Sequence, residues 1–167
     1  MAVINAIVTG NVESKAVDTG VAARFTGGIL KAIPFSFEIA AGDDANSIHR
    51  FARISPSDIV VGLELMIDAI AGLTETDIGF YKPLEVGGAV VDIDAIVDGA
   101  DYHAGLAVQT EVFVPAIDSI GKNAYELAGI TEPNSIGYGS FDVAITNVSN
   151  VTAAGTFAGV LYIVSGV

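Results

Sequence analysis

The stretch from Tyr138 to Gly166 constrains the fold of this 167-residue chain more than any other part. Apolar and polar side chains alternate from Phe141 to Thr146, and a Ser/Asn/Thr-rich stretch then leads to a second apolar run, Thr156 to Val164. This pattern is typical of two strands joined by a turn region. No charged residue follows Asp142, so the second strand needs cover from its own sheet or from a neighbour. We therefore expect a β-rich building block in which Leu161 is buried.

The composition also favours strands. Hydrophobic residues make up 51% of the chain and charged residues 16%, against roughly 25% charged in an average soluble domain. Nineteen glycines and five prolines suit a fold with many turns. The length fits one domain with a sizeable core.

Period-two alternation predicts about eight short strands. They are expected around residues 29–40, 47–54, 59–70, 76–82, 89–97, 106–114, 141–146 and 156–164. Short strands at regular spacing favour a β-sandwich, with a jelly roll as the first choice and an immunoglobulin-like sandwich as the second. Residues 84–101, which include the 89–97 strand or helical turn, are otherwise predicted to be a long loop.

One short helix is predicted near residues 117–128. Asp118 or Ser119 is the expected N-cap, and Gly129 is expected to close the helix, with Ile130 making the hydrophobic contact behind it.

Residues 1–28 lack a clear period and predict an extended N-terminal arm, whereas residues 29–167 predict a single sandwich domain. The arm either embraces a neighbouring subunit or forms an ordinary loop and edge strand. The candidate contacts to other subunits or to a partner surface are Val3, Ile4, Ile7, Arg24, Phe25, Arg50, Arg53, Phe157, Leu161 and Ile163.

The net charge of −13 makes a nucleic-acid partner improbable, because an acidic surface repels phosphates. Arg24, Lys31, Arg50 and Arg53 could form a local basic spot, although surface ion pairing is the favoured interpretation. The chain has no cysteine, which excludes disulfides and thiolate metal sites. We expect neither a signal peptide nor a membrane span.

Residue patterns for catalysis or cofactor binding are weak. The only two histidines, His49 and His103, lie far apart in sequence, and no nucleophile elbow or phosphate loop occurs. Residues Asp92 to Asp101 offer carboxylates that would suit calcium, but their spacing does not match an EF-hand loop. A solvated acidic loop is favoured, and calcium binding stays open. We expect a protein without enzymatic activity or cofactor.

Tyrosines offer an alternative function. Tyr81, Tyr102, Tyr125 and Tyr138 could line a sugar-binding surface, although packing in the core or at an interface is the favoured role.

Several phrases in order along the chain resemble small virion structural proteins of tailed bacteriophages, of the capsid decoration or cement type. The phrases are RFARISPSDIV (Arg50–Val60), the alternating strand Gly62–Ile70, AGLTETDIGFY (Ala71–Tyr81), DIDAIVDGAD (Asp92–Asp101), YELAGI (Tyr125–Ile130) and the ending Ala153–Gly166. The resemblance covers about residues 47–166, and the first 46 residues take no part in it.

The resemblance implies a β-sandwich or jelly-roll subunit that binds the outside of an assembled capsid. Such a subunit, made in the host cytoplasm, would bridge neighbouring major capsid protein subunits and reinforce the shell. It would associate with itself, as a homotrimer or alternatively a homodimer. The alternatives are another virion part, such as a tail or head-fibre base, and a stand-alone module that binds carbohydrate or peptide.

Overall fold

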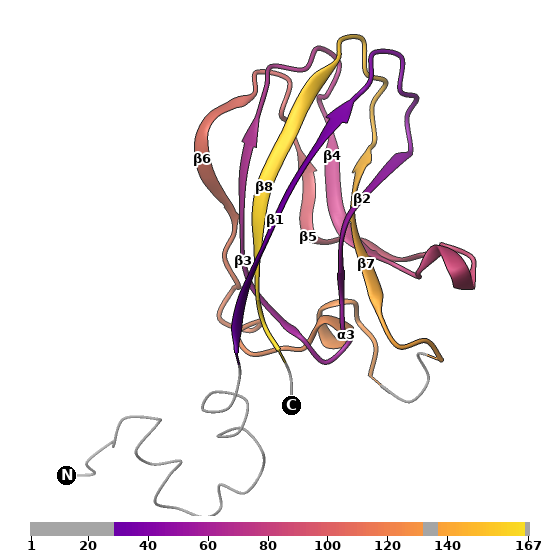
Figure 1. Cartoon of the computed structure of the whole chain (residues 1–167), viewed down its shortest axis with the longest axis vertical. Coiled ribbons are helices and arrows are strands. Elements are labelled where there is room, and N and C mark those ends of the chain that lie inside the picture. Colours follow the sequence, from indigo (N-terminus) through magenta and orange to yellow (C-terminus); the bar gives the residue numbers. More distant parts are fainter. Residues whose placement is uncertain (1–28, 132–136, 166–167) are drawn as a thin grey trace, which may run out of the picture.

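The computed structural model describes residues 29–131 and 137–165, and the expected arm at residues 1–28 lies outside these residues. Eight strands in these residues form two four-stranded antiparallel sheets (Figure 1). The elements are β1 (Leu30–Ile39), β2 (Ser47–Ile54), β3 (Ile59–Ile67), β4 (Thr76–Tyr81), the 3-10 turn η2 (Leu84–Val86), β5 (Val90–Ala100), β6 (Leu106–Phe113), the helix α3 (Ala124–Leu127), β7 (Phe141–Asn147) and β8 (Gly155–Val164).

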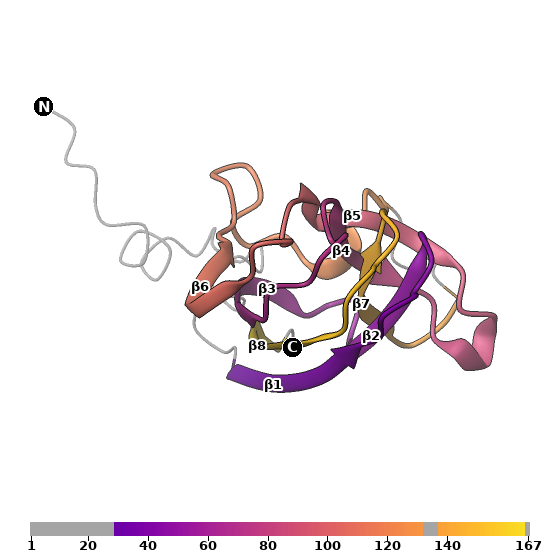
Figure 2. The same ribbon diagram turned by 90° about the horizontal axis from the view of Figure 1, so that it is seen from above.

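The strand order confirms the all-β prediction and its first choice, the jelly roll. One sheet has the order β1-β8-β3-β6 and is called here the β8 sheet; the other has the order β2-β7-β4-β5 and is called the β7 sheet. Apart from the β4–β5 hairpin, consecutive strands lie in different sheets. Eight antiparallel strands that cross back and forth between two packed sheets are the jelly-roll arrangement. Figure 2 shows the two layers from above.

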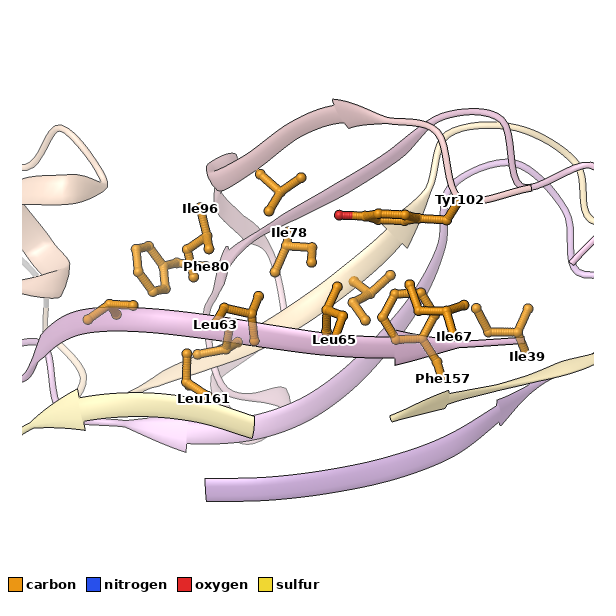
Figure 3. Close-up of a cluster of buried hydrophobic side chains, with 14 of the residues drawn as sticks. Ile39, Leu63, Leu65, Ile67, Ile78, Phe80, Ile96, Tyr102, Phe157 and Leu161 are labelled. Carbon is orange, nitrogen blue, oxygen red and sulfur yellow. The ribbon is translucent and has the colours of Figure 1, made fainter. Parts of the chain in front are cut away.

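The core lies between the sheets. Leu63 and Leu65 of β3, with Leu161 of β8, face Ile78 and Phe80 of β4, and all five side chains are fully buried (Figure 3). The last strand confirms the opening prediction, because β8 pairs with β1 over residues 155–164 and with β3 over residues 157–164. The backbone groups of β8 are thus paired on both sides, so this apolar strand does not form an open edge of the sheet.

Two predicted elements differ from the structure. The short strand or helical turn expected at residues 89–97 is a strand, and it is longer than predicted: β5 covers Val90–Ala100, and register shifts interrupt its pairing with β4. The sequence pattern is ambiguous here for two reasons. The strand is rich in acidic residues, and its bulges add unpaired residues that break the alternation.

The helix is also shorter than expected. It covers only Ala124–Leu127, because Gly121 has a φ of +78°, a left-handed conformation that interrupts a right-handed helix. The N-cap is Asn123, which shares a capping box with Glu126, and neither Asp118 nor Ser119 has this role. The predicted C-terminus is confirmed. The Gly129 and Ile130 amides donate to the carbonyls of Glu126 and Tyr125, as in a Schellman motif.

No helix in the described part of the chain is long and apolar enough to cross a membrane.

The position of β8 yields a matched pair of substitutions. Leu161 is fully buried, whereas its neighbour Val160 points to the outer side of the β8 sheet. We expect Leu161→Lys to lower the free energy of unfolding by roughly 3 kcal/mol or more, because it buries an unpaired charge. Val160→Lys should cost less than about 1 kcal/mol. Urea unfolding followed by circular dichroism measures both, and equal losses would contradict the assigned faces.

Candidate interaction surfaces

The outer face of the β8 sheet has an uncharged central strand and three carboxylates on the other strands of the sheet. Its centre is β8, in which inward side chains such as Phe157 alternate with outward ones. None of the outward side chains is charged. Register with β1 and β3 fixes the neighbours. The face consists of Thr156, Ala158, Val160, Tyr162 and Val164 of β8, Leu30, Ala32, Pro34, Ser36 and Glu38 of β1, Gly62, Glu64 and Met66 of β3, and, beside Glu64, Gln109 and Glu111 of β6.

The charge at the middle of this face is held by hydrogen bonds. The Glu64 carboxylate accepts a hydrogen bond of 2.9 Å from the Tyr162 hydroxyl and another from the Gln109 amide of β6. The bond to Glu64 raises the pKa of Tyr162, because it favours the protonated phenol. The three side chains tie β8, β3 and β6 together on the outside of the sheet and keep one carboxylate fixed.

Two shallow hollows lie beside Met66 on the same face, with volumes of ≈ 460 and ≈ 160 Å³. Met66 and Ala158 line both, and Met66 is 48% exposed. Methionine adapts its shape to different contacts. The face thus offers an apolar, slightly hollowed surface that suits docking against another protein.

The opposite face of the sandwich has a different character. Asp142 of β7 is only 4% exposed and accepts a 2.6 Å hydrogen bond from the Arg53 guanidinium. Arg50 lies 3.4 Å from the same carboxylate and donates to the Gly88 carbonyl. Arg53 also pairs with Glu85 of η2. This network fixes the β4–β5 hairpin to the outer side of the β7 sheet.

Two of the four residues of the predicted basic spot, Arg50 and Arg53, form ion pairs with carboxylates, which agrees with the favoured interpretation of surface ion pairing. Hydrogen bonds to Asp142 and Glu85 raise the pKa of Arg53, and the bond from Arg53 lowers the pKa of Glu85. Since carboxylates compensate both arginines, little positive charge is left for a phosphate-bearing partner.

A second apolar feature lies over the β7 sheet. A groove of ≈ 530 Å³ runs between Ile48 of β2 and Val90 of β5, which are 39% and 52% exposed. Leu84 and Val86 are exposed at the tip of the β4–β5 hairpin, beyond the groove. This hairpin tip projects from the side of the molecule in Figure 1.

The candidate contacts named from the sequence fall into three groups. Phe157, Leu161 and Ile163 point into the core, with at most 2% of each exposed. Their role is revised to packing, and the outward residues of β8 take their place as surface candidates. Strand alternation would have allowed this choice from the sequence. Arg50 and Arg53 belong to the network above. Val3, Ile4, Ile7, Arg24 and Phe25 lie outside the described residues.

The two histidines occupy separate environments. His49 stacks on Phe37 at 5.3 Å and approaches Asp43 to 3.3 Å, while the His103 imidazole lies 2.7 Å from Asp101. Neither imidazole has a hydroxyl as hydrogen-bond partner within residues 29–131 and 137–165. An Asp–His pair without a nucleophile does not form a catalytic triad.

The acidic run is distributed along β5 and the turn that follows it. Across the residues described, no group of three or more side chains is placed to hold a metal ion. Asp92 and Asp94 do lie together. The pKa of Asp92 is raised mainly by its burial and also by the hydrogen bond with Asp94 and the charge of that residue.

The tyrosines do not form an exposed aromatic surface. Tyr81 and Tyr102 are buried; the Tyr81 hydroxyl bonds Thr146 at 2.5 Å, and burial raises the pKa of Tyr102 to about 12. Packing, the favoured role of these two residues, is confirmed.

The raised pKa of Asp92 gives a prediction about pH. The folded protein holds this proton more tightly than the unfolded chain does. The stabilising contribution is therefore complete below the ordinary carboxyl pKa of about 4 and is lost as pH rises through the higher folded value. We expect Asp92→Asn to raise the melting temperature at pH 7 and to have less effect at pH 4. Asp98→Asn, on the exposed end of β5, is the control. An unchanged or lowered melting temperature at pH 7 would contradict this account.

Comparison with known proteins identifies the fold. No protein-family model and no curated protein matches the sequence. A chain in the capsid asymmetric unit of cyanophage Pam1 superposes with a TM-score of 0.53, and a chain in the capsid of Ralstonia phage GP4 with a TM-score of 0.57. Each is 13% identical, and each match covers 83% of this chain and 86% of that chain. The sandwich described above is thus a fold found in chains of two phage capsids.

Proposed function

We propose that this chain is a non-enzymatic virion structural protein that binds the outer surface of an assembled phage capsid, bridges major capsid protein subunits and stabilises the head. The single observation that carries the proposal is the fold shared with chains of two phage capsids over 83% of this chain. Fold alone does not determine function, so the surfaces supply the second argument.

The outer face of the β8 sheet is the proposed docking surface. The chain has a net charge of −13, yet the central strand of this face has no charged side chain. The carboxylates of the face, Glu38, Glu64 and Glu111, lie on the other strands of the sheet. Interface centres are likewise depleted in charge. The opposite outer face is occupied by the Arg50, Arg53 and Asp142 network, so the β8 face is the better candidate.

The charge also supports a place on the exterior. A polyanionic subunit is repelled by packaged nucleic acid and is not repelled by a neutral or basic protein surface. Synthesis in the host cytoplasm agrees with a chain that has no cysteine and therefore needs no oxidising compartment. Each subunit would add a modest contact, and many copies over a lattice would add up.

Two other functions stay open. The groove between Ile48 and Val90 favours a module that binds an extended apolar peptide, because its lining is apolar. Another virion location, such as a tail or head-fibre base, would use the same face on a different partner.

The test of the docking surface is co-sedimentation with heads that lack this protein. We expect the wild-type chain to bind, and Val160→Lys to weaken binding at least tenfold, because it places a charge at the centre of the apolar face. Leu84→Lys on the hairpin tip, where the native side chain is 65% exposed, is the matched control. Failure of the wild type to bind would overturn the function. Normal binding by Val160→Lys would overturn only the face.

The N-terminal segment gives a separate prediction. Removal of residues 1–20 should weaken attachment to heads more than it lowers the melting temperature, because the eight strands described for the sandwich all lie at Leu30 and beyond. Co-sedimentation and thermal unfolding of the same truncated protein measure the two effects. Normal attachment would show that the segment plays no part.

A further inference from the structure

The strand β6 leaves a sheet edge open. It is the last strand of the β8 sheet and pairs only with β3, at four recorded register positions. Within the residues described, no backbone hydrogen bond joins β6 to another element. Val108 is 71% exposed, and Ala107 and Gln109 beside it are exposed as well. Figures 1 and 2 show β6 at the margin of the molecule.

The other three edges carry features that hinder strand addition. Proline and charged side chains are the usual protection of an edge. These residues are Pro34 and Lys31 on β1, Arg50 and Arg53 on β2, and Asp92, Asp94 and Asp98 on β5. β6 has no proline and one charged residue, Glu111. Its free backbone groups are a template for an incoming strand.

The segment that precedes β1 has the matching chemistry. Residues 2–9 are uncharged and include Val3, Ile4, Ile7 and Val8, which favour strands. Two acidic and two basic residues cancel within residues 1–28, so the whole net charge of −13 belongs to residues 29–167. Two copies of the acidic domain repel each other, whereas a neutral segment approaches an acidic domain without that penalty.

We propose that residues 2–9 of a second copy of this chain add as a strand to the free edge of β6. The inference deepens the proposed function, because it names the contact through which copies associate. It rests on that function only for the expectation that the chain works as an oligomer.

The reach of the segment favours a second copy over the same chain. β1 and β6 are separated by two strands, so the edge of β6 lies about 14 Å from β1 in its own sheet, at ~4.8 Å per strand. Residues 10–29 can span roughly 65 Å when extended. This connection is several times longer than the distance from β1 to the β6 edge of the same chain. Its length therefore suits a segment that crosses to a neighbouring copy.

Light scattering on a sizing column tests the contact. We expect the full chain to be an oligomer, and both a deletion of residues 2–9 and Val108→Lys to run as monomers with unchanged melting temperatures. Ile117→Lys, at a side chain that is 92% exposed and belongs to no strand, is the control and should keep the wild-type mass. A monomeric wild type overturns the inference, as does an oligomer that survives either change.

Mixing the two defective proteins separates exchange between copies from docking within one chain. The Val108→Lys protein keeps the segment and the deletion protein keeps the open edge, so together they should form a complex with one copy of each. Absence of that mixed complex overturns the second-copy assignment. Head binding does not enter either readout. A chain that oligomerises as expected and ignores heads would therefore refute the proposed function and leave this contact standing.

Discussion

The burial of β8 between β1 and β3 is the constraint on which the rest of this structure depends. The strand comes last in the described chain, yet it occupies the interior of its sheet. The strand order of this sheet follows from that position, because the chain returns at its last strand and β8 inserts between β1 and β3. Its inward side chains fill the core, and its outward side chains form the centre of an uncharged face.

The two outer faces of the sandwich differ in how they treat charge. On the β7 side, the buried carboxylate of Asp142 is satisfied by Arg50 and Arg53, and a buried charge without such partners would be costly. On the β8 side, the strand at the centre has no charge to satisfy. A chain with 18 acidic residues in residues 29–167 thus keeps the central strand of one outer face free of them, with Glu38, Glu64 and Glu111 on the other strands of that sheet. That uncharged centre is the physical basis of the proposed docking.

Much of this fold could be predicted from the sequence. Alternation predicted the strands, and the sandwich with jelly-roll topology is confirmed, as is the closing role of Gly129. The alternation left β5 as a short strand or a helical turn, because its bulges break the period. The N-terminal half of the predicted helix is not formed, because Gly121 has a left-handed backbone that the composition does not reveal. The surface residues were harder still. Strand alternation separates Phe157, Leu161 and Ile163 from Val160 and Tyr162, and the burial of the first three in the folded sheet shows that the other two point outward.

The central claim is that this chain reinforces a capsid, and the most direct measurement is the temperature at which heads release their DNA, with and without saturating amounts of the protein. The account predicts a higher release temperature in its presence, because each bound copy adds contacts that must be broken before the shell opens. An unchanged release temperature at full occupancy would contradict reinforcement.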